Sequence, residues 1–266
     1  MKQTLQLGAH VSASGGVWKC FENARKIGAN TLQIFGSSPR VWRASVHKEA
    51  DTQRFKQAWK ESSVVSIYIH APYLINLASP DTELQRKSVE SLSTQLMIAE
   101  NLGINGVIFH IGSGKEMPKE QALKIVVEQL KQVLRKASGN TQLIIENAAG
   151  GGAKIGATFD EIGLIMKQVD SSRVKVCIDT AHAFESGLIE HYTSEEVRQF
   201  FHMVEKHVGM ENVVALHVND SKTVFNSKHD RHENLGEGYI GLAAFQTLAK
   251  EKSLHNKAWL LEVPGF

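Results

Sequence analysis

The sequence predicts a single α/β domain, a (β/α)8 or TIM barrel that spans residues 1–266. Eight short apolar runs rich in β-branched residues alternate with amphipathic helical stretches, which favours βαβ units and a parallel sheet. The pattern repeats at roughly thirty residues, the length of one strand and one helix in such a barrel. Several of the runs are apolar on both faces, which is typical of strands that are buried on both sides.

The predicted strands alternate with helices from the start of the chain to its last residues. An open doubly wound sheet is the alternative, but no Gly-x-Gly-x-x-Gly turn follows the first strand, so we favour the barrel. The predicted strands are 5–11, 31–36, 66–71, 106–111, 142–147, 174–179, 213–219 and 258–263.

Three of the intervening helices carry clear sequence signals. The first covers 17–28, the second runs on from about Leu84, and the third follows Pro118 and ends near Gly139. In each, apolar residues recur at helical spacing. Ser79 is the predicted N-cap of the second helix, and a proline and an acid follow it in the first turn.

The final helix of a (β/α)8 barrel has no counterpart in the sequence. The predicted strand at 258–263 lies next to the last residue, Phe266, so we expect a barrel without its C-terminal helix. Either the seam of the barrel is covered in another way, or the sequence stops early.

Composition limits the class of protein. Hydrophobic residues make up 42% and charged residues 22%, which are values of globular domains. The net charge is only +2, so any nucleic-acid site must come from local arrangement. Two cysteines are too few for a disulfide framework. There is no apolar stretch of the kind found in signal peptides or transmembrane helices, so we expect a soluble, cytoplasmic protein.

Polar residues follow six consecutive predicted strands at their carboxyl ends, which face one common mouth in a barrel. Histidine and carboxylate together suit zinc, manganese or iron, and the lack of cysteine argues against a purely structural zinc site. A polar mouth without metal is the simpler alternative, but six such strand ends in a row favour a metal site. The candidate ligands are His70, His110, Glu146, Asp179, His182, His217, Asp230, His232 and Glu262.

Nine candidate ligands exceed the need of one or two ions, because a zinc ion takes about three or four protein ligands. Three divalent ions would bring +6 and the four carboxylates −4, which leaves a surplus of +2. Such a site favours an anionic substrate, and a phosphodiester is the obvious candidate.

Six motifs, in order and at the expected spacing, closely resemble endonuclease IV, the trinuclear-zinc apurinic/apyrimidinic endonuclease family. The resemblance runs from about residue 7 to the last strand. The motifs are Gly8-Ala-His-Val-Ser12, His70-Ala-Pro-Tyr-Leu-Ile-Asn-Leu77, Ile145-Glu-Asn-Ala-Ala-Gly150, Ile178-Asp-Thr-Ala-His182, Leu216-His-Val-Asn-Asp-Ser221 and His229-Asp-Arg-His-Glu-Asn-Leu-Gly-Glu-Gly238.

The resemblance implies three zinc ions per chain, with manganese or iron as possible occupants of some sites. It assigns the ligands as follows: His70, His110 and Glu146 to the first ion, Glu146, Asp179, His217 and Glu262 to the second, and His182, Asp230 and His232 to the third.

The implied reaction is a step of base excision repair. A hydroxide that bridges metal ions attacks phosphorus on the 5′ side of an abasic site, which leaves a 3′-hydroxyl and a 5′-deoxyribose phosphate. Groups that block 3′ ends are removed in the same way. Glu146 bridges two ions and Glu262 orients the nucleophile, so both are predicted catalytic residues. The implied partner is double-stranded DNA with such lesions, and we expect a monomer.

Arg40, Tyr73 and Leu74 match family residues that push into the base stack at the lesion. A guanidinium and an aromatic ring can replace lost stacking, which is worth about 1–3 kcal/mol per base. Arg40 could otherwise be a solvated cation and Tyr73 a half-buried loop residue. His10 also ends a strand but lies outside the implied ligand set, so it either supports a ligand or has a structural role.

The sequence departs from the family pattern at Ile111, Ala181 and Val263, where proline, cysteine and threonine are usual. None of these is an implied ligand, so we expect the metals to survive, although the loop after the fourth strand can differ in shape. A sugar isomerase or epimerase on a related barrel and a non-catalytic lesion-binding protein are the alternative functions.

Overall fold

A computed structural model describes residues 5–42, 44 and 46–264 of the chain. Its centre is a closed barrel in which each strand pairs with its neighbours in parallel, in the order β1-β10-β7-β6-β5-β4-β3-β2. The prediction of a (β/α)8 barrel is confirmed, and every predicted strand agrees with an observed one to within two residues at either end. The barrel strands are β1 (Gln6–His10), β2 (Thr31–Phe35), β3 (Ser66–His70), β4 (Gly106–Phe109), β5 (Gln142–Glu146), β6 (Val174–Asp179), β7 (Val213–His217) and β10 (Ala258–Leu261).

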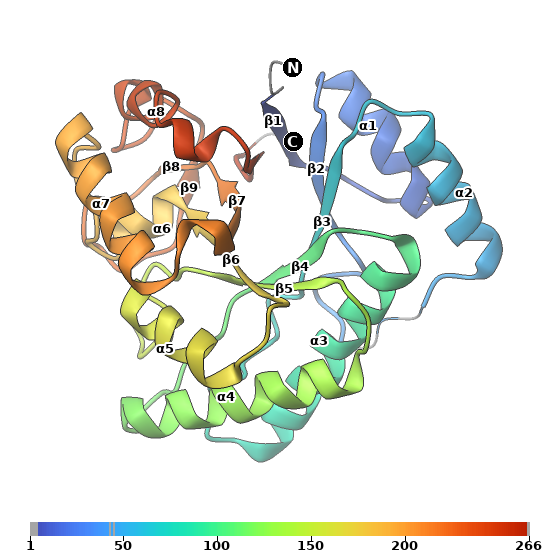
Figure 1. The fold of residues 1–266 in the computed structure, drawn as a ribbon, viewed down its shortest axis with the longest axis horizontal. Helices are drawn as coiled ribbons and strands as arrows, with labels where there is room; N and C mark the ends of the chain where they lie inside the picture. Colours follow the sequence, from blue (N-terminus) through green and yellow to red (C-terminus); the bar gives the residue numbers. More distant parts are fainter. Residues whose placement is uncertain (1–4, 43, 45, 265–266) are drawn as a thin grey trace.

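Helices surround the ring of strands, as Figure 1 shows. No helix in the described part of the chain is long and apolar enough to cross a membrane. The helices are α1 (Cys20–Lys26), α2 (Glu49–Lys60), α3 (Thr82–Leu102), α4 (Lys119–Lys136), α5 (Phe159–Val169), α6 (Thr180–Glu185), α7 (Ser194–His207) and α8 (Leu242–Leu248), and the short 3-10 turns are η1 (Val17–Lys19), η2 (Met210–Asn212) and η3 (Lys252–Leu254).

Helix α3 shows where the sequence prediction was wrong in detail. Its N-cap is Asp81, whose carboxylate accepts hydrogen bonds from the backbone N–H groups of Glu83 (2.8 Å) and Leu84 (3.1 Å). Ser79, the predicted cap, instead accepts a hydrogen bond from the N–H of Asp81. At the other end Gly103 adopts a left-handed conformation with φ 77°, which a residue without a Cβ tolerates best.

The connection from β7 to β10 is the most elaborate loop at the mouth of the barrel. It contains a two-stranded antiparallel sheet of β8 (Asp220–Ser221) and β9 (His232–Glu233) before the chain reaches α8. The loop between β8 and β9 carries Asp230, and β9 itself carries His232. These two candidate ligands are therefore brought to the mouth by a loop. His182 lies on helix α6, and the others stand on barrel strands or directly after them.

Two apolar layers hold the barrel together. The larger lies between the strands and the helices, and the smaller fills the inside of the barrel. Alternate side chains of a strand point to opposite faces, so the next inward position on each strand lies two residues further on. The inner layer is formed by Tyr68, Ile108, Ile144, Cys177, Ala215, Ala258 and Leu260.

The seam between β1 and β10 is closed by strand pairing, with Leu7 opposite Trp259. Within the described residues, which reach 264, no helix follows β10. On the outer face of β1, Leu7 keeps 50% of its surface exposed.

Candidate metal centre

The candidate ligands on the barrel strands form the layer directly above the apolar inner layer. Each lies two residues beyond an inward-facing apolar residue, so the pleat of the strand aims it into the mouth. The sequence prediction that these strand ends converge is therefore confirmed by the fold. The residues in this layer are His70, His110, Glu146, Asp179, His217 and Glu262.

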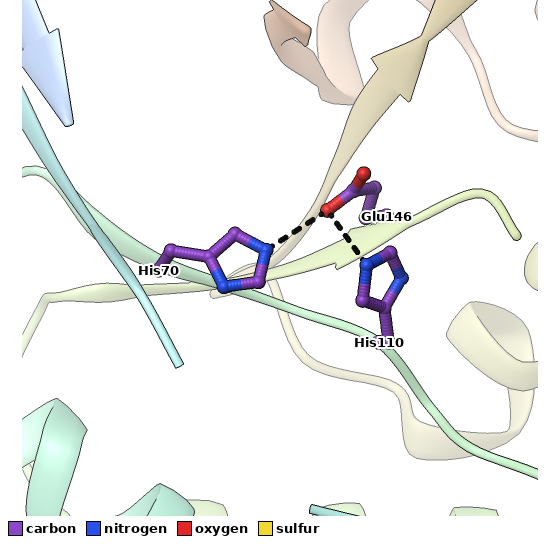
Figure 2. Close-up of side chains that lie close together, drawn as sticks. All are labelled: His70, His110 and Glu146. Atoms are coloured by element: carbon purple, nitrogen blue, oxygen red, sulfur yellow. Dashed lines mark hydrogen bonds and ion pairs between the residues drawn. The ribbon is translucent and has the colours of Figure 1, made fainter. Parts of the chain in front are cut away.

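The first cluster consists of His70, His110 and Glu146, which stand at the ends of β3, β4 and β5. Figure 2 shows that both imidazoles approach the same carboxylate oxygen. Glu146 Oε2 lies 3.3 Å from His70 Nε2 and 3.6 Å from His110 Nε2. His70 and Glu146 are fully buried.

The second cluster is centred on His217. Its Nδ1 lies 3.1 Å from Glu146 Oε1, 3.1 Å from Glu262 Oε2 and 3.9 Å from Asp179 Oδ2. The two oxygens of Glu146 thus face different clusters. This arrangement allows one carboxylate to bridge two ions, as the ligand assignment requires.

The third cluster combines His182 with the β8–β9 loop. His182 Nε2 lies 3.3 Å from Asp230 Oδ1, and His232 Nε2 lies 3.8 Å from the same oxygen and 3.5 Å from Asp179 Oδ2. Asp179 caps helix α6 by accepting a hydrogen bond from the N–H of His182, which places both residues in the first turn of that helix. Asp179 is therefore shared between the second and third clusters, a feature that the sequence did not reveal.

Four of the five candidate-ligand histidines have one ring nitrogen hydrogen-bonded to a carbonyl oxygen. Three of these oxygens belong to the backbone, and one belongs to the side-chain amide of Gln33. In a neutral ring the held nitrogen carries the proton, so the other nitrogen is free to act as a ligand. In each case the free nitrogen faces the carboxylates. The bonds run from His70 Nδ1 to Ala71 O (2.8 Å), from His182 Nδ1 to Asn147 O (3.0 Å), from His217 Nε2 to Gln33 Oε1 (2.8 Å) and from His232 Nδ1 to Glu262 O (3.1 Å).

The donor set fits metal ions. A buried polar atom without a partner costs about 1–3 kcal/mol, so several of them in one place indicate a missing ligand. Nitrogen and carboxylate oxygen without sulfur suit zinc, manganese or iron. Among the described residues, the buried atoms without a hydrogen-bond partner include Glu146 Oε1, His182 Nε2, His217 Nδ1 and His232 Nε2, which are all candidate ligand atoms.

Neighbouring charges within the clusters shift the pKa values of the candidate ligands in the direction opposite to burial. Burial raises the pKa of Glu146, but the neighbouring His110 and His217 outweigh it and hold that pKa well below its ordinary value. Burial lowers the pKa of His182, but Asp179 and other carboxylates outweigh it and hold that pKa well above its ordinary value. Without metal, protons therefore take part of the compensating role of a cation, and metal and protons compete for the same atoms.

Two of the three predicted DNA-contacting residues lie beside the candidate ligands. Tyr73 and Leu74 line a cavity of about 440 Å³ together with the candidate ligands His70, His110 and Asp230. Tyr73 is 66% exposed although its ring packs edge-on against Phe35, with ring centroids 5.7 Å apart.

Arg40 is exposed on the loop between β2 and α2 and does not line this cavity. The structure thus brings Tyr73 and Leu74 to the clusters but leaves Arg40 outside them.

Two polar side chains that the sequence reading missed touch the ligands. Gln33 on β2 contacts both His217 and Glu262. Asn219 donates to Asp179 Oδ2 (2.7 Å) and accepts from the backbone N–H of Glu262 (2.8 Å). The signal for Gln33 was present, because it is an amide between the apolar residues Leu32 and Ile34 of the strand.

Glu185 is a third missed residue, and it holds the β8–β9 loop. It is fully buried, and its Oε1 accepts hydrogen bonds from Ser221 Oγ (2.7 Å) and from the N–H of Arg231 (3.1 Å). Burial raises the pKa of Glu185 to about 7. Its carboxyl group thus connects α6 to the segment that presents Asp230 and His232.

Replacing Glu185 with Gln should flatten the pH dependence of stability. The folded state holds a proton that the unfolded chain releases, so the free energy of unfolding falls as pH rises from about 4.5 to about 7. Glutamine keeps the accepting oxygen but does not titrate. Thermal unfolding of metal-free protein at about pH 5 and pH 8 checks this. The unfolding temperature of the parent should drop more than that of Glu185→Gln, and equal drops would contradict the assignment.

Comparison with known proteins identifies relatives over nearly the whole chain. Residues 21–265 match the family model of the xylose isomerase-like TIM barrel. The chain is 38% identical to the probable endonuclease 4 of Aquifex aeolicus, over 97% of this chain and 91% of that protein. It is 34% identical to the probable endonuclease 4 of Persephonella marina, over 98% and 91%.

Solved structures agree with these relatives. The crystal structure of endonuclease IV from Thermus thermophilus is similar with a TM-score of 0.87 and 33% identity, over 98% of this chain and 93% of that one. A D-psicose 3-epimerase from Clostridium cellulolyticum matches with a TM-score of 0.68 but only 17% identity, which shows the shared fold alone. Within the xylose isomerase-like TIM barrels, the chain therefore belongs to the endonuclease IV family of enzymes.

Proposed function

We propose that this chain is a metal-dependent DNA-repair endonuclease that hydrolyses the phosphodiester 5′ to an abasic site and leaves a 3′-hydroxyl and a 5′-deoxyribose phosphate. The same site would remove blocking groups from 3′ ends. One observation carries the proposal. Nine candidate ligands form adjoining clusters whose unpartnered atoms face one another, beside a cavity lined by Tyr73 and Leu74.

Three zinc ions, with manganese or iron as alternatives, account for this arrangement. The first would be held by His70, His110 and Glu146, the second by Glu146, Asp179, His217 and Glu262, and the third by His182, Asp230 and His232. The resulting surplus of positive charge supports a phosphodiester as substrate, because four carboxylates do not balance three divalent cations.

Bound metal ions would supply an ionised water near neutral pH and would stabilise charge on the phosphate oxygens. The protein's own contribution is to fix the groups around that water. Glu146 is buried between the first and second clusters. Its Oε2 faces His70 in the first, and its Oε1 faces His217 in the second. Glu262 faces the second cluster with Oε2 while Gln33 restrains its Oε1, so this carboxylate is placed to orient the nucleophile.

Tyr73, Leu74 and Arg40 would contact the DNA at the lesion. The exposed ring of Tyr73 stands next to the first cluster, with ring centroids 5.4 Å from His70, where it can stack on a base beside the abasic nucleotide. An abasic nucleotide has no stacking of its own, so turning it out of the helix costs less than for a normal nucleotide. Selectivity for the lesion would follow from this difference.

Truncating Tyr73 to Ala should raise KM for an abasic duplex about tenfold, because it removes one stacking platform. Metal content should be unchanged, since the side chain is not a ligand. Tyr73→Phe is the matched control and should keep most of the affinity, because the ring remains. Steady-state kinetics and metal analysis of the three proteins check this. If Tyr73→Ala binds the duplex as tightly as the parent, Tyr73 does not contact the lesion.

The proposed enzyme acts as a monomer. All nine candidate ligands come from one chain, so the site needs no residue from a second copy. Size-exclusion chromatography with light scattering tests this at the concentration of the activity assay.

A synthetic duplex with one abasic site tests the proposed function. The proposal expects cleavage on the 5′ side of the lesion, loss of cleavage after chelation, and recovery when zinc is added back. Cleavage on the 3′ side, or cleavage that resists chelator, would contradict it. A metal-loaded protein that leaves the duplex intact but converts ketose sugars would favour the isomerase alternative.

A further inference from the structure

Gln33 lies in the wall of the barrel, directly behind the second cluster. It is the middle residue of β2, is fully buried, and pairs in register with His10 on β1. A buried amide must satisfy both its carbonyl and its NH2 group, or the unmet group costs free energy. Gln33 satisfies both of them on residues of the candidate metal centre.

Both ends of the amide bond a candidate ligand. Its Oε1 lies 2.8 Å from His217 Nε2, and its Nε2 lies 2.5 Å from Glu262 Oε1. The same Nε2 lies 3.0 Å from His10 Nδ1. The two hydrogens of the NH2 group are thus used by Glu262 and His10, and the carbonyl is used by His217.

The chemistry of these partners fixes the orientation of the amide. A carboxylate only accepts hydrogen bonds, so the NH2 group of Gln33 must face Glu262. The carbonyl then faces His217 and requires a proton on His217 Nε2. In the neutral ring that can bind a metal, Nδ1 is then the free nitrogen, and it lies 3.1 Å from both Glu146 Oε1 and Glu262 Oε2.

We propose that Gln33 is a positioning residue that selects the metal-binding tautomer of His217 and orients Glu262 in the same step. One side chain therefore prepares two of the four ligands of the second ion. It links them to His10, which explains why this histidine ends a strand at the mouth without being a ligand. The inference rests on the proposed metal centre and adds to it a residue outside the ligand set.

Removing the amide of Gln33 should weaken the binding of one metal ion and leave the binding of the others unchanged. Residues that hydrogen-bond to a metal ligand without contacting the metal typically contribute 10–100-fold to metal affinity. The two candidate ligands that Gln33 contacts, His217 and Glu262, both belong to the second cluster and to neither of the others. We therefore expect Gln33→Met, which keeps the length of the side chain but cannot hydrogen bond, to bind one ion 10–100-fold more weakly than the parent.

The matched control is Gln129→Met. Gln129 is also a buried glutamine, but it lies on α4 and bonds Gln85, far from the ligands in the fold. Both variants lose one buried amide. Any general effect of that change on stability should therefore appear in both, as a similar unfolding temperature of the metal-free proteins.

Competition with a chromophoric zinc chelator measures the affinity of each ion, and kinetics on an abasic duplex gives kcat and KM. We expect Gln33→Met to bind one ion more weakly and to have a lower kcat than Gln129→Met. Its KM and the unfolding temperature of the metal-free protein should be close to those of Gln129→Met. If Gln33→Met holds all its ions as tightly as Gln129→Met, the inference is wrong while the proposed function stands. If the parent binds none of zinc, manganese and iron, both are wrong.

Discussion

Replacing Glu262 with Gln should reduce cleavage of an abasic duplex by at least about 10²-fold while the duplex still binds, because the proposed mechanism uses this carboxylate at the reacting centre. Glu262 Oε2 lies 3.1 Å from His217 Nδ1 in the second cluster, and its Oε1 is held by Gln33. The amide has nearly the same shape but no charge, and it is a poorer metal ligand than a carboxylate. The effect should therefore appear in kcat and only weakly in KM.

The measurement is single-turnover cleavage together with binding of the abasic duplex to the chelated protein. Glu161→Gln is the matched control, because Glu161 is a buried carboxylate on α5 that bonds the N–H of Gly156 and lies outside the clusters. It makes the same chemical change without touching a ligand. Unchanged turnover in Glu262→Gln would exclude a role at the nucleophile.

Replacing Glu146 with Gln should remove more than one ion from the protein. Its Oε2 faces His70 and His110 in the first cluster, and its Oε1 faces His217 in the second. A neutral amide cannot bridge two cations, so both sites should lose affinity together, and cleavage should be lost with them. Metal content after desalting, measured by mass spectrometry, checks this.

The fold of Glu146→Gln needs its own control, since the change also removes the carboxylate that balances the buried imidazoles. Removing one partner of a buried ion pair lowers the free energy of unfolding by about 3–5 kcal/mol. Circular dichroism at low temperature should still show the barrel. A folded variant that loses only one ion, or that keeps full activity, would show that Glu146 does not bridge the first two sites.

The sequence was sufficient for the barrel and for its ligand layer because both depend on local periodicity. Strands such as Val174–Asp179 combine an apolar run with a polar end, and the pleat aims that end into the mouth. The side chains two residues earlier, such as Cys177 before Asp179, fill the inside of the barrel. One rule, the period of two, therefore placed the core and the site together.

The sequence was insufficient where two residues compete or where contacts join distant strands. Ser79 and Asp81 are both good N-caps, and only the observed backbone shows that Asp81 takes the role. Gln33 and Glu262 are 229 positions apart, and they meet because β1, β2 and β10 lie next to one another at the seam. Such pairings depend on the closed barrel and are invisible in the pattern of one strand.

Glu185 was missed for a related reason. A glutamate at the end of a short helix predicts a solvated side chain, but the β8–β9 loop covers it and buries its carboxyl group. The loop after β4, where Ile111 stands in place of the family's usual proline, is also set by long-range contacts. Ile111 is buried, and its carbonyl accepts a hydrogen bond from the N–H of Leu77.

The number of ions in the active protein tests most directly the proposed three-metal centre that cleaves DNA at abasic sites. Metal analysis and abasic-duplex cleavage should be measured on the same preparation during stepwise removal of metal by chelator. We expect three ions per chain at full activity and a loss of cleavage as they are withdrawn. Full activity in a preparation that holds only one or two ions per chain would contradict it.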